Sequence, residues 1–111
     1  MIHKMKLNNE PFNNIDKGTK TIELRLNDEK RQQLKVNDII EFTNRETSKK
    51  LLAQVIDLHK YPSFEELFKN FDKKDLGYKE EEEAKSTDME KYYSKEEQDK
   101  YGVVGIKIKK L

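Results

Sequence analysis

Apolar and polar residues alternate strictly in one segment of this chain, where Ile22, Leu24 and Leu26 enclose Glu23 and Arg25. This period of two predicts a strand with one buried face. The other face then carries a carboxylate and a guanidinium that point the same way. Two interpretations of that face remain open. It is either a solvated surface with cross-strand ion pairs or a polar site built on a rigid strand.

The hydrophobic pattern predicts five strands in all. We expect them at residues 2–7, 20–27, 39–42, 51–59 and 103–108. The apolar run within residues 51–59 is typical of a buried strand. A polar connection at residues 44–50 turns this strand back onto the one before it, so residues 34–59 are expected to form a hairpin.

Helix-start and helix-stop signals account for much of the remaining chain. An Asn9 cap with Pro11 in the first turn opens a helix that Gly18 closes. Residues 28–33 are expected to form a charged turn or a short helix. Capping boxes of the form Ser/Thr-x-x-Glu predict three further short helices, which begin at Ser63, Thr87 and Ser94.

Together these elements predict an α+β fold with one helix after the first strand and a helical insertion before the last strand. A small set of about five or six strands, whose terminal strand must find a partner, predicts a small closed or nearly closed β-barrel. The chain has no internal repeat and no linker-like segment. We therefore expect residues 1–111 to form a single domain.

The composition indicates a folded domain with a small core and a heavily charged surface. Only 33% of the residues are apolar and 41% are charged, so the core must be small, yet a net charge of +1 and ten aromatic residues argue against disorder. Residues 72–100 are acidic, whereas residues 17–35 and 107–110 are basic. The chain has no cysteine, no signal-peptide pattern and no run long enough to span a membrane, which predicts a soluble cytoplasmic protein.

Several other residue types could carry chemistry. His3 and His59 are far apart and are expected to be structural, so we predict no metal site. The run Glu80–Glu83 is either a solvated helix face or the source of a general acid or base that folds over the alternating strand. Three tyrosines lie near the predicted helix ends, namely Tyr92, Tyr93 and Tyr101. Their rings either line the core, or one of them stacks on a base at a cleft.

The chain contains the pattern Gly18-x-Lys20-x-x-Glu23-x-Arg25, followed by a turn at residues 34–38 and a strand from Ile39. This arrangement resembles the ASCH domain family, in particular its small bacterial members. The closing segment at residues 101–106 resembles the end of the same proteins. The family is related to the PUA-type RNA-binding barrels. The resemblance implies a PUA-like barrel whose cleft beside this strand binds RNA or a nucleotide, and we predict no cofactor. It implies a ligand-binding set of Gly18, Lys20, Thr21, Glu23 and Arg25.

One branch of the family resembles an amidohydrolase that removes the acetyl group from acetylated cytidine with a lysine, a threonine and a distant glutamate. Lys20 matches that lysine, but Glu23 stands at the threonine position, and the distant glutamate falls within Glu80–Glu83. A hydrolase that uses Lys20 and Glu23 is therefore the alternative to a binding module. A third alternative is a protein partner for the acidic insertion. The binding hypothesis predicts that Lys20→Ala or Arg25→Ala weakens RNA binding with little change in thermal midpoint.

Overall fold

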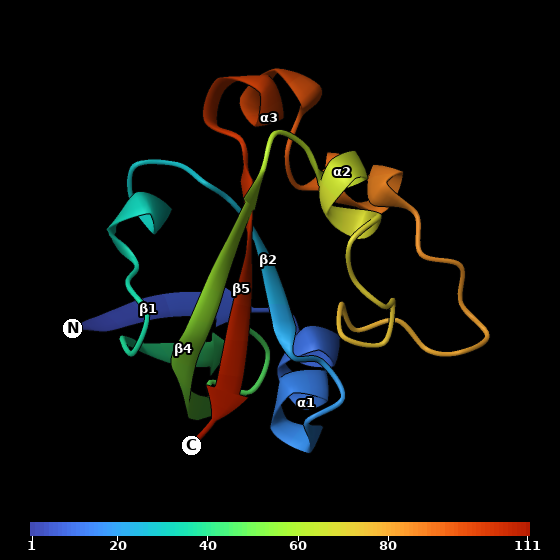
Figure 1. The fold of residues 1–111 in the computed structure, drawn as a ribbon. Coiled ribbons are helices and arrows are strands. Elements are labelled where there is room, and N and C mark those ends of the chain that lie inside the picture. Colours follow the sequence, from blue (N-terminus) through green and yellow to red (C-terminus); the bar gives the residue numbers. More distant parts are fainter.

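All five strands lie in one curled sheet in the computed structural model, which describes all 111 residues (Figure 1). The strand order is β1-β3-β4-β5-β2, with β1 parallel to β3 and every other neighbouring pair antiparallel. The strands are β1 (Ile2–Leu7), β2 (Ile22–Leu26), β3 (Ile39–Asn44), β4 (Lys50–Tyr61) and β5 (Val103–Lys110).

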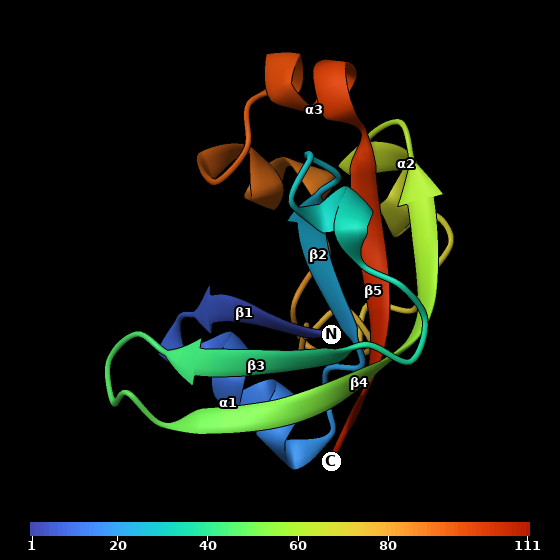
Figure 2. The same ribbon diagram turned by 90° about the vertical axis from the view of Figure 1, so that its left-hand side faces the viewer.

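The predicted α+β fold with five strands is confirmed, and the sheet is a half-barrel rather than a closed one. The edge strands β1 and β2 approach each other as the sheet curls, but no ladder joins them (Figure 2). A side chain spans this seam instead, because Arg25 Nη2 on β2 donates to the Lys6 carbonyl oxygen on β1 at 3.0 Å. The predicted hairpin is confirmed by the antiparallel pairing of β3 with β4.

The helices are short and lie where the sequence places them, after β1 and between β4 and β5. They are α1 (Asn9–Lys17), α2 (Phe64–Phe68) and α3 (Lys95–Tyr101), with 3-10 turns η1 (Arg31–Gln33) and η2 (Ser86–Lys91). No helix combines the length and the apolar character needed to cross a bilayer.

The capping predictions are correct in three places and wrong in two. Gly18 closes α1 in the left-handed conformation, with φ of 81°, and Ser63 accepts a hydrogen bond from the Glu66 amide. Ser94 forms a complete capping box at α3. However, the residue that precedes α1 is Asn8 rather than Asn9, and its side chain makes no capping bond. The box at Thr87 is absent because Thr87 lies inside η2, whose first flanking residue is Lys85.

Buried side chains form two clusters on opposite faces of the sheet. We call inner cluster the larger one, which lies against α1 and the concave face of the sheet and includes Phe42 and Ile106. We call outer cluster the smaller one, where Leu24 of β2 packs with Phe64 and Leu67 of α2. Since successive side chains of a strand point to opposite faces, β2 has one face in each environment.

Of the two interpretations of the polar face of β2, the solvated surface is the one that the structure does not support, because Glu23 and Arg25 are largely buried. Glu23 lies opposite Ile106 and Arg25 lies opposite Val104 in the β2–β5 register, which directs both side chains to the inner side of the sheet. Glu23 is only 3% exposed. The insertion between β4 and β5 covers the other face of β2, and this cover cannot be seen from the alternation alone.

Candidate functional site

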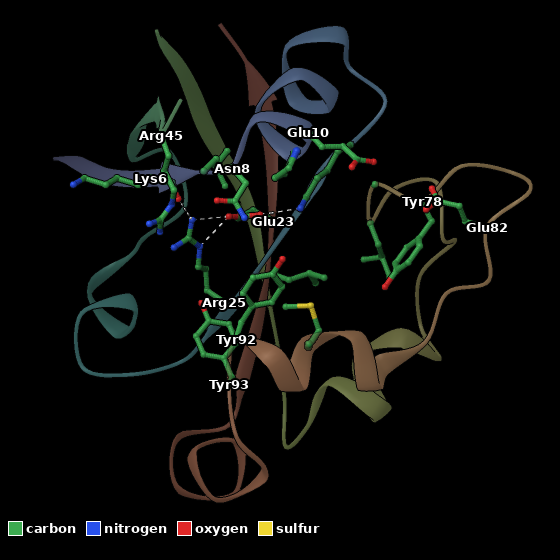
Figure 3. Close-up of a pocket in the computed structure, with 17 residues that line it drawn as sticks. Lys6, Asn8, Glu10, Glu23, Arg25, Arg45, Tyr78, Glu82, Tyr92 and Tyr93 are labelled. Carbon is green, nitrogen blue, oxygen red and sulfur yellow. Dashed lines mark hydrogen bonds and ion pairs between the residues drawn. The ribbon is translucent and has the colours of Figure 1, made fainter. Parts of the chain in front are cut away.

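A pocket of about 420 Å³ opens at the seam between β1 and β2. Its walls are the end of β1, the start of α1, the edge of β2 and parts of residues 76–93 from the insertion (Figure 3). This volume lies within the range of roughly 300–1,000 Å³ that is typical of small-molecule sites. The predicted residues Lys20, Glu23 and Arg25 all line it.

Glu23 is held between two cations at the floor of this pocket. Its Oε1 lies 3.0 Å from Lys20 Nζ, and its Oε2 accepts from Arg25 Nε at 2.9 Å and lies 2.8 Å from Arg25 Nη2. Burial alone would raise the pKa of this carboxyl, but the charges and hydrogen bonds of Lys20 and Arg25 outweigh burial and lower the pKa to about 2. Glu23 is therefore ionised throughout the physiological pH range.

We call Lys20, Glu23 and Arg25 the ion trio. Arg25 links this trio to β1, on the opposite side of the seam. The same Nη2 that contacts Glu23 also donates to the carbonyl oxygen of Lys6. Burial lowers the pKa of the guanidinium, whereas the Glu23 carboxylate and the Tyr93 phenol raise it, and the net effect is a raised pKa. One arginine thus fixes a buried carboxylate and joins β2 to β1.

Gly77 determines where the Lys20 side chain can lie. It has φ of +99°, and a Cβ at this position would lie 3.0 Å from Lys20 Cδ, so the lysine side chain would have to shift to make room. Asn14 of α1 ties the two segments together, since its carbonyl oxygen accepts from the Lys20 amide and its Nδ2 donates to the Gly77 carbonyl oxygen. The glycine is visible in the sequence as a break, but its contact with Lys20 is not.

Two residues of the expected ligand-binding set do not line the pocket. Gly18 is the C-cap of α1, and Thr21 donates its hydroxyl to Asp75 Oδ1 at 2.9 Å. The Thr21 and Ile22 amides also donate to the Asp75 carbonyl oxygen, so this contact fixes the insertion to the start of β2. Both Gly18 and Thr21 therefore have structural positions, and the Thr21 hydroxyl is engaged away from the trio.

Aromatic rings from the insertion form the opposite wall. Tyr93 stacks on Phe64 with ring centroids 5.8 Å apart, which holds it in place, whereas Tyr92 is 55% exposed at the rim. Tyr78 also lines the pocket and donates to Asp88 Oδ2 at 2.8 Å. Tyr101 packs against the outer cluster and is not part of the site.

Two further cations at the rim have no counterpart in the sequence prediction. Lys6 and Arg45 are exposed, line the pocket and have no acidic partner. They come together because β1 pairs with β3 in parallel, so that the ends of the two strands meet at one edge. Such a non-local pairing leaves no local signal at either residue.

The other sequence candidates lie apart from the trio. Of the glutamate run only Glu82 lines the pocket, and its Oε1 accepts from the Lys79 amide at 2.8 Å. His3 contacts Asp38 at 2.8 Å, and His59 packs edge-on against Phe71. No group of three or more His, Cys, Asp or Glu side chains is arranged to hold a metal ion.

The chemistry of the trio suits binding better than proton transfer. A carboxylate with a pKa of about 2 and both oxygens engaged is a poor general base near neutral pH. The trio also changes the expectation that Lys20→Ala or Arg25→Ala leaves the thermal midpoint nearly unchanged. Either substitution would leave a buried carboxylate short of a partner, and broken buried pairs cost about 3–5 kcal/mol.

The comparisons with known proteins agree with this architecture. The ASCH domain family model matches residues 5–111. The crystal structure of the hypothetical protein PH0355 from Pyrococcus is 33% identical, with a TM-score of 0.84 over 100% of both chains. The solution structure of protein PF0455 from Pyrococcus furiosus is 33% identical, with a TM-score of 0.77 over 100% of this chain and 98% of that one. No curated protein matches this chain. The family model and these two structures confirm the resemblance, and the chain belongs to the ASCH domain family.

Proposed function

We propose that the seam pocket binds one nucleotide of a single-stranded RNA. The observation that carries this proposal is the convergence of cations and an exposed aromatic ring on one pocket of suitable volume. Lys20 and Arg25 lie at its floor, Lys6 and Arg45 lie at its rim, and the exposed ring of Tyr92 also lines it. Nucleic-acid sites that accept single strands combine a basic groove with rings on which bases stack.

The two pairs of cations have different parts in this proposal. Glu23 neutralises part of the charge at the floor and fixes Lys20 and Arg25 in place. Lys20 keeps two further N–H groups for an acceptor atom of the ligand, because its ammonium carries three. Lys6 and Arg45 have no carboxylate to satisfy them, so their charge is available to phosphate.

The aromatic wall supplies the contact with the base. Tyr93 cannot turn freely because it stacks on Phe64, but more than half of the Tyr92 surface is open to solvent. Removal of one stacking ring costs roughly 1–3 kcal/mol per base.

The hydrolase alternative has no comparable support. Glu23 is ionised and occupied, and the Thr21 hydroxyl donates to Asp75 rather than toward Lys20. Lys20 itself lies 3.0 Å from the Glu23 carboxylate, so its nitrogen is engaged in an ion pair. Glu82 is held by the backbone at Lys79. Binding therefore remains the function that the geometry favours.

Fluorescence anisotropy with labelled RNA hexamers tests the proposal. Four homopolymers at low salt would identify the preferred base. We expect Tyr92→Ala to weaken binding by about five- to a hundredfold and Tyr92→Phe to preserve it, since stacking needs only the ring. Arg45→Ala should weaken binding and lower the slope of log affinity against log salt by about one.

These rim variants keep the test independent of folding, because the side chains of Tyr92 and Arg45 are exposed and make no ion pair or hydrogen bond. Lys109→Ala provides the matched control. Lys109 is an exposed cation on β5 that does not line the pocket and has no ion-pair partner. If no hexamer binds, or if Lys109→Ala weakens binding as much as Arg45→Ala does, the pocket is not the RNA site.

A further inference from the structure

The free edge of β2 presents backbone hydrogen-bonding groups to the seam. The Ile108 amide donates to the Thr21 carbonyl oxygen, and the Asn27 amide donates to the Gly102 carbonyl oxygen. These bonds set the phase of the antiparallel β2–β5 ladder, in which hydrogen-bonded residues alternate with residues that face outward. Residues 21, 23, 25 and 27 therefore bond to β5, and residues 22, 24 and 26 direct their amide and carbonyl groups to the open edge.

The insertion contacts one end of this edge, and Leu24 lies where the pocket opens. The Ile22 amide donates to the Asp75 carbonyl oxygen, which closes one end of the edge. Leu26 does not line the pocket, whereas Leu24 does. The Leu24 side chain packs into the outer cluster, on the face away from Glu23 and Arg25. The ladder directs the Leu24 amide and carbonyl to the open edge of β2, so the backbone of Leu24 faces the pocket that this residue lines.

From this geometry we infer that the Leu24 amide and carbonyl read the Watson–Crick edge of an unpaired base. The inference rests on the proposed function and deepens it. An N–H and a C=O side by side match a ring nitrogen beside an amino group, as in adenine and cytosine. They match a ring N–H beside a carbonyl equally well, as in uracil and guanine.

The contact with Leu24 restricts the kind of RNA that can bind. A base whose Watson–Crick edge meets Leu24 cannot pair with another base at the same time. The pocket therefore selects single strands over duplexes, through a contact that no side-chain substitution removes. The remaining N–H groups of Lys20 lie on the same floor and can meet a further acceptor atom of the base or sugar.

Amide hydrogen exchange followed by NMR tests the contact directly. In the free protein we expect the Leu24 amide to exchange at least about tenfold faster than the Glu23 and Arg25 amides, which are bonded to β5. Saturation with the preferred RNA hexamer should slow the exchange of Leu24 and leave that of the other two amides unchanged. A Leu24 amide as protected as Arg25 in the free protein, or unaffected by saturating RNA, would overturn the inference.

Edge-methylated RNA separates this contact from RNA binding as such. The probe is the preferred hexamer and its counterpart methylated on the Watson–Crick edge, at N3 of a pyrimidine or N1 of a purine. We expect methylation to weaken binding by about tenfold or more. Equal binding of the two hexamers would overturn the edge contact while leaving the proposed function intact. If neither hexamer binds, the proposed function fails and the inference fails with it.

Discussion

Neutralising Glu23 should weaken the fold in a way that depends on pH. Glu23→Gln keeps the shape of the side chain but leaves Lys20 and Arg25 facing each other without a counter-charge. Both cations are nearly buried, with side chains 10% and 12% exposed. The loss should be large at neutral pH, since removing one partner of a buried pair typically costs about 3–5 kcal/mol.

The pKa of Glu23 gives a second, independent value for the contribution of this side chain to stability. Its value falls from 4.5 to about 2 on folding, and each pKa unit corresponds to about 1.4 kcal/mol, so ionised Glu23 contributes about 3 kcal/mol to stability at pH 7. Because the folded pKa is the lower one, this stability is present above pH 4.5 and is lost as the pH falls toward 2. About 2 kcal/mol of it should already be lost at pH 3.

Urea unfolding followed by circular dichroism measures this effect at pH 7 and pH 3. We expect the difference in unfolding free energy between wild type and Glu23→Gln to shrink by about 2 kcal/mol at the lower pH. Glu81→Gln is the control, because Glu81 is exposed and has no ion-pair partner, and it should change stability by less than about 0.5 kcal/mol. If the difference for Glu23→Gln is the same at both pH values, then the trio does not hold Glu23 as described.

Two further predictions follow from the pocket. Gly77→Ala should lower the thermal midpoint and weaken RNA binding together, because the new Cβ meets Lys20 Cδ at 3.0 Å and the φ of +99° disfavours alanine. Calorimetry measures the midpoint and anisotropy measures the binding. An unchanged midpoint would contradict the account of Gly77. Incubation with acetylated cytidine at high protein concentration should release no acetate, because both carboxylate oxygens of Glu23 are paired with Lys20 and Arg25. Acetate release that is lost in Lys20→Ala would restore the hydrolase hypothesis.

The sequence was sufficient for the strands because their pattern is local. The alternation around Glu23 predicts β2, and the hairpin of β3 and β4 follows from the polar connection between two apolar runs. The motif also brought Lys20, Glu23 and Arg25 into one site before their distances were known. These three residues lie within six positions on one strand and its entrance, so strand geometry alone keeps them together.

What the sequence could not supply is the cover over β2 and the far side of the pocket. Glu23 is buried only because the insertion folds back onto the strand, and the amide-to-carbonyl contacts with Asp75 that fix the insertion have no pattern. Arg45 reaches the pocket through the parallel pairing of β1 with β3, which joins segments far apart in the chain. The failed capping box at Thr87 shows the same limit, since a short motif gave way to its tertiary surroundings.

The position of the trio supports a role in the proposed binding rather than in stability alone. Apolar residues in place of a buried ion pair are often neutral or stabilising, and the neighbours of Glu23 and Arg25 on β5 are members of the inner cluster. Stability alone therefore gives no reason for three charges on the concave face. An apolar side chain at position 25 could neither donate to the Lys6 carbonyl oxygen nor place N–H groups in the pocket. The trio does both, so the joining of β1 to β2 and the proposed binding at the seam depend on the same three side chains.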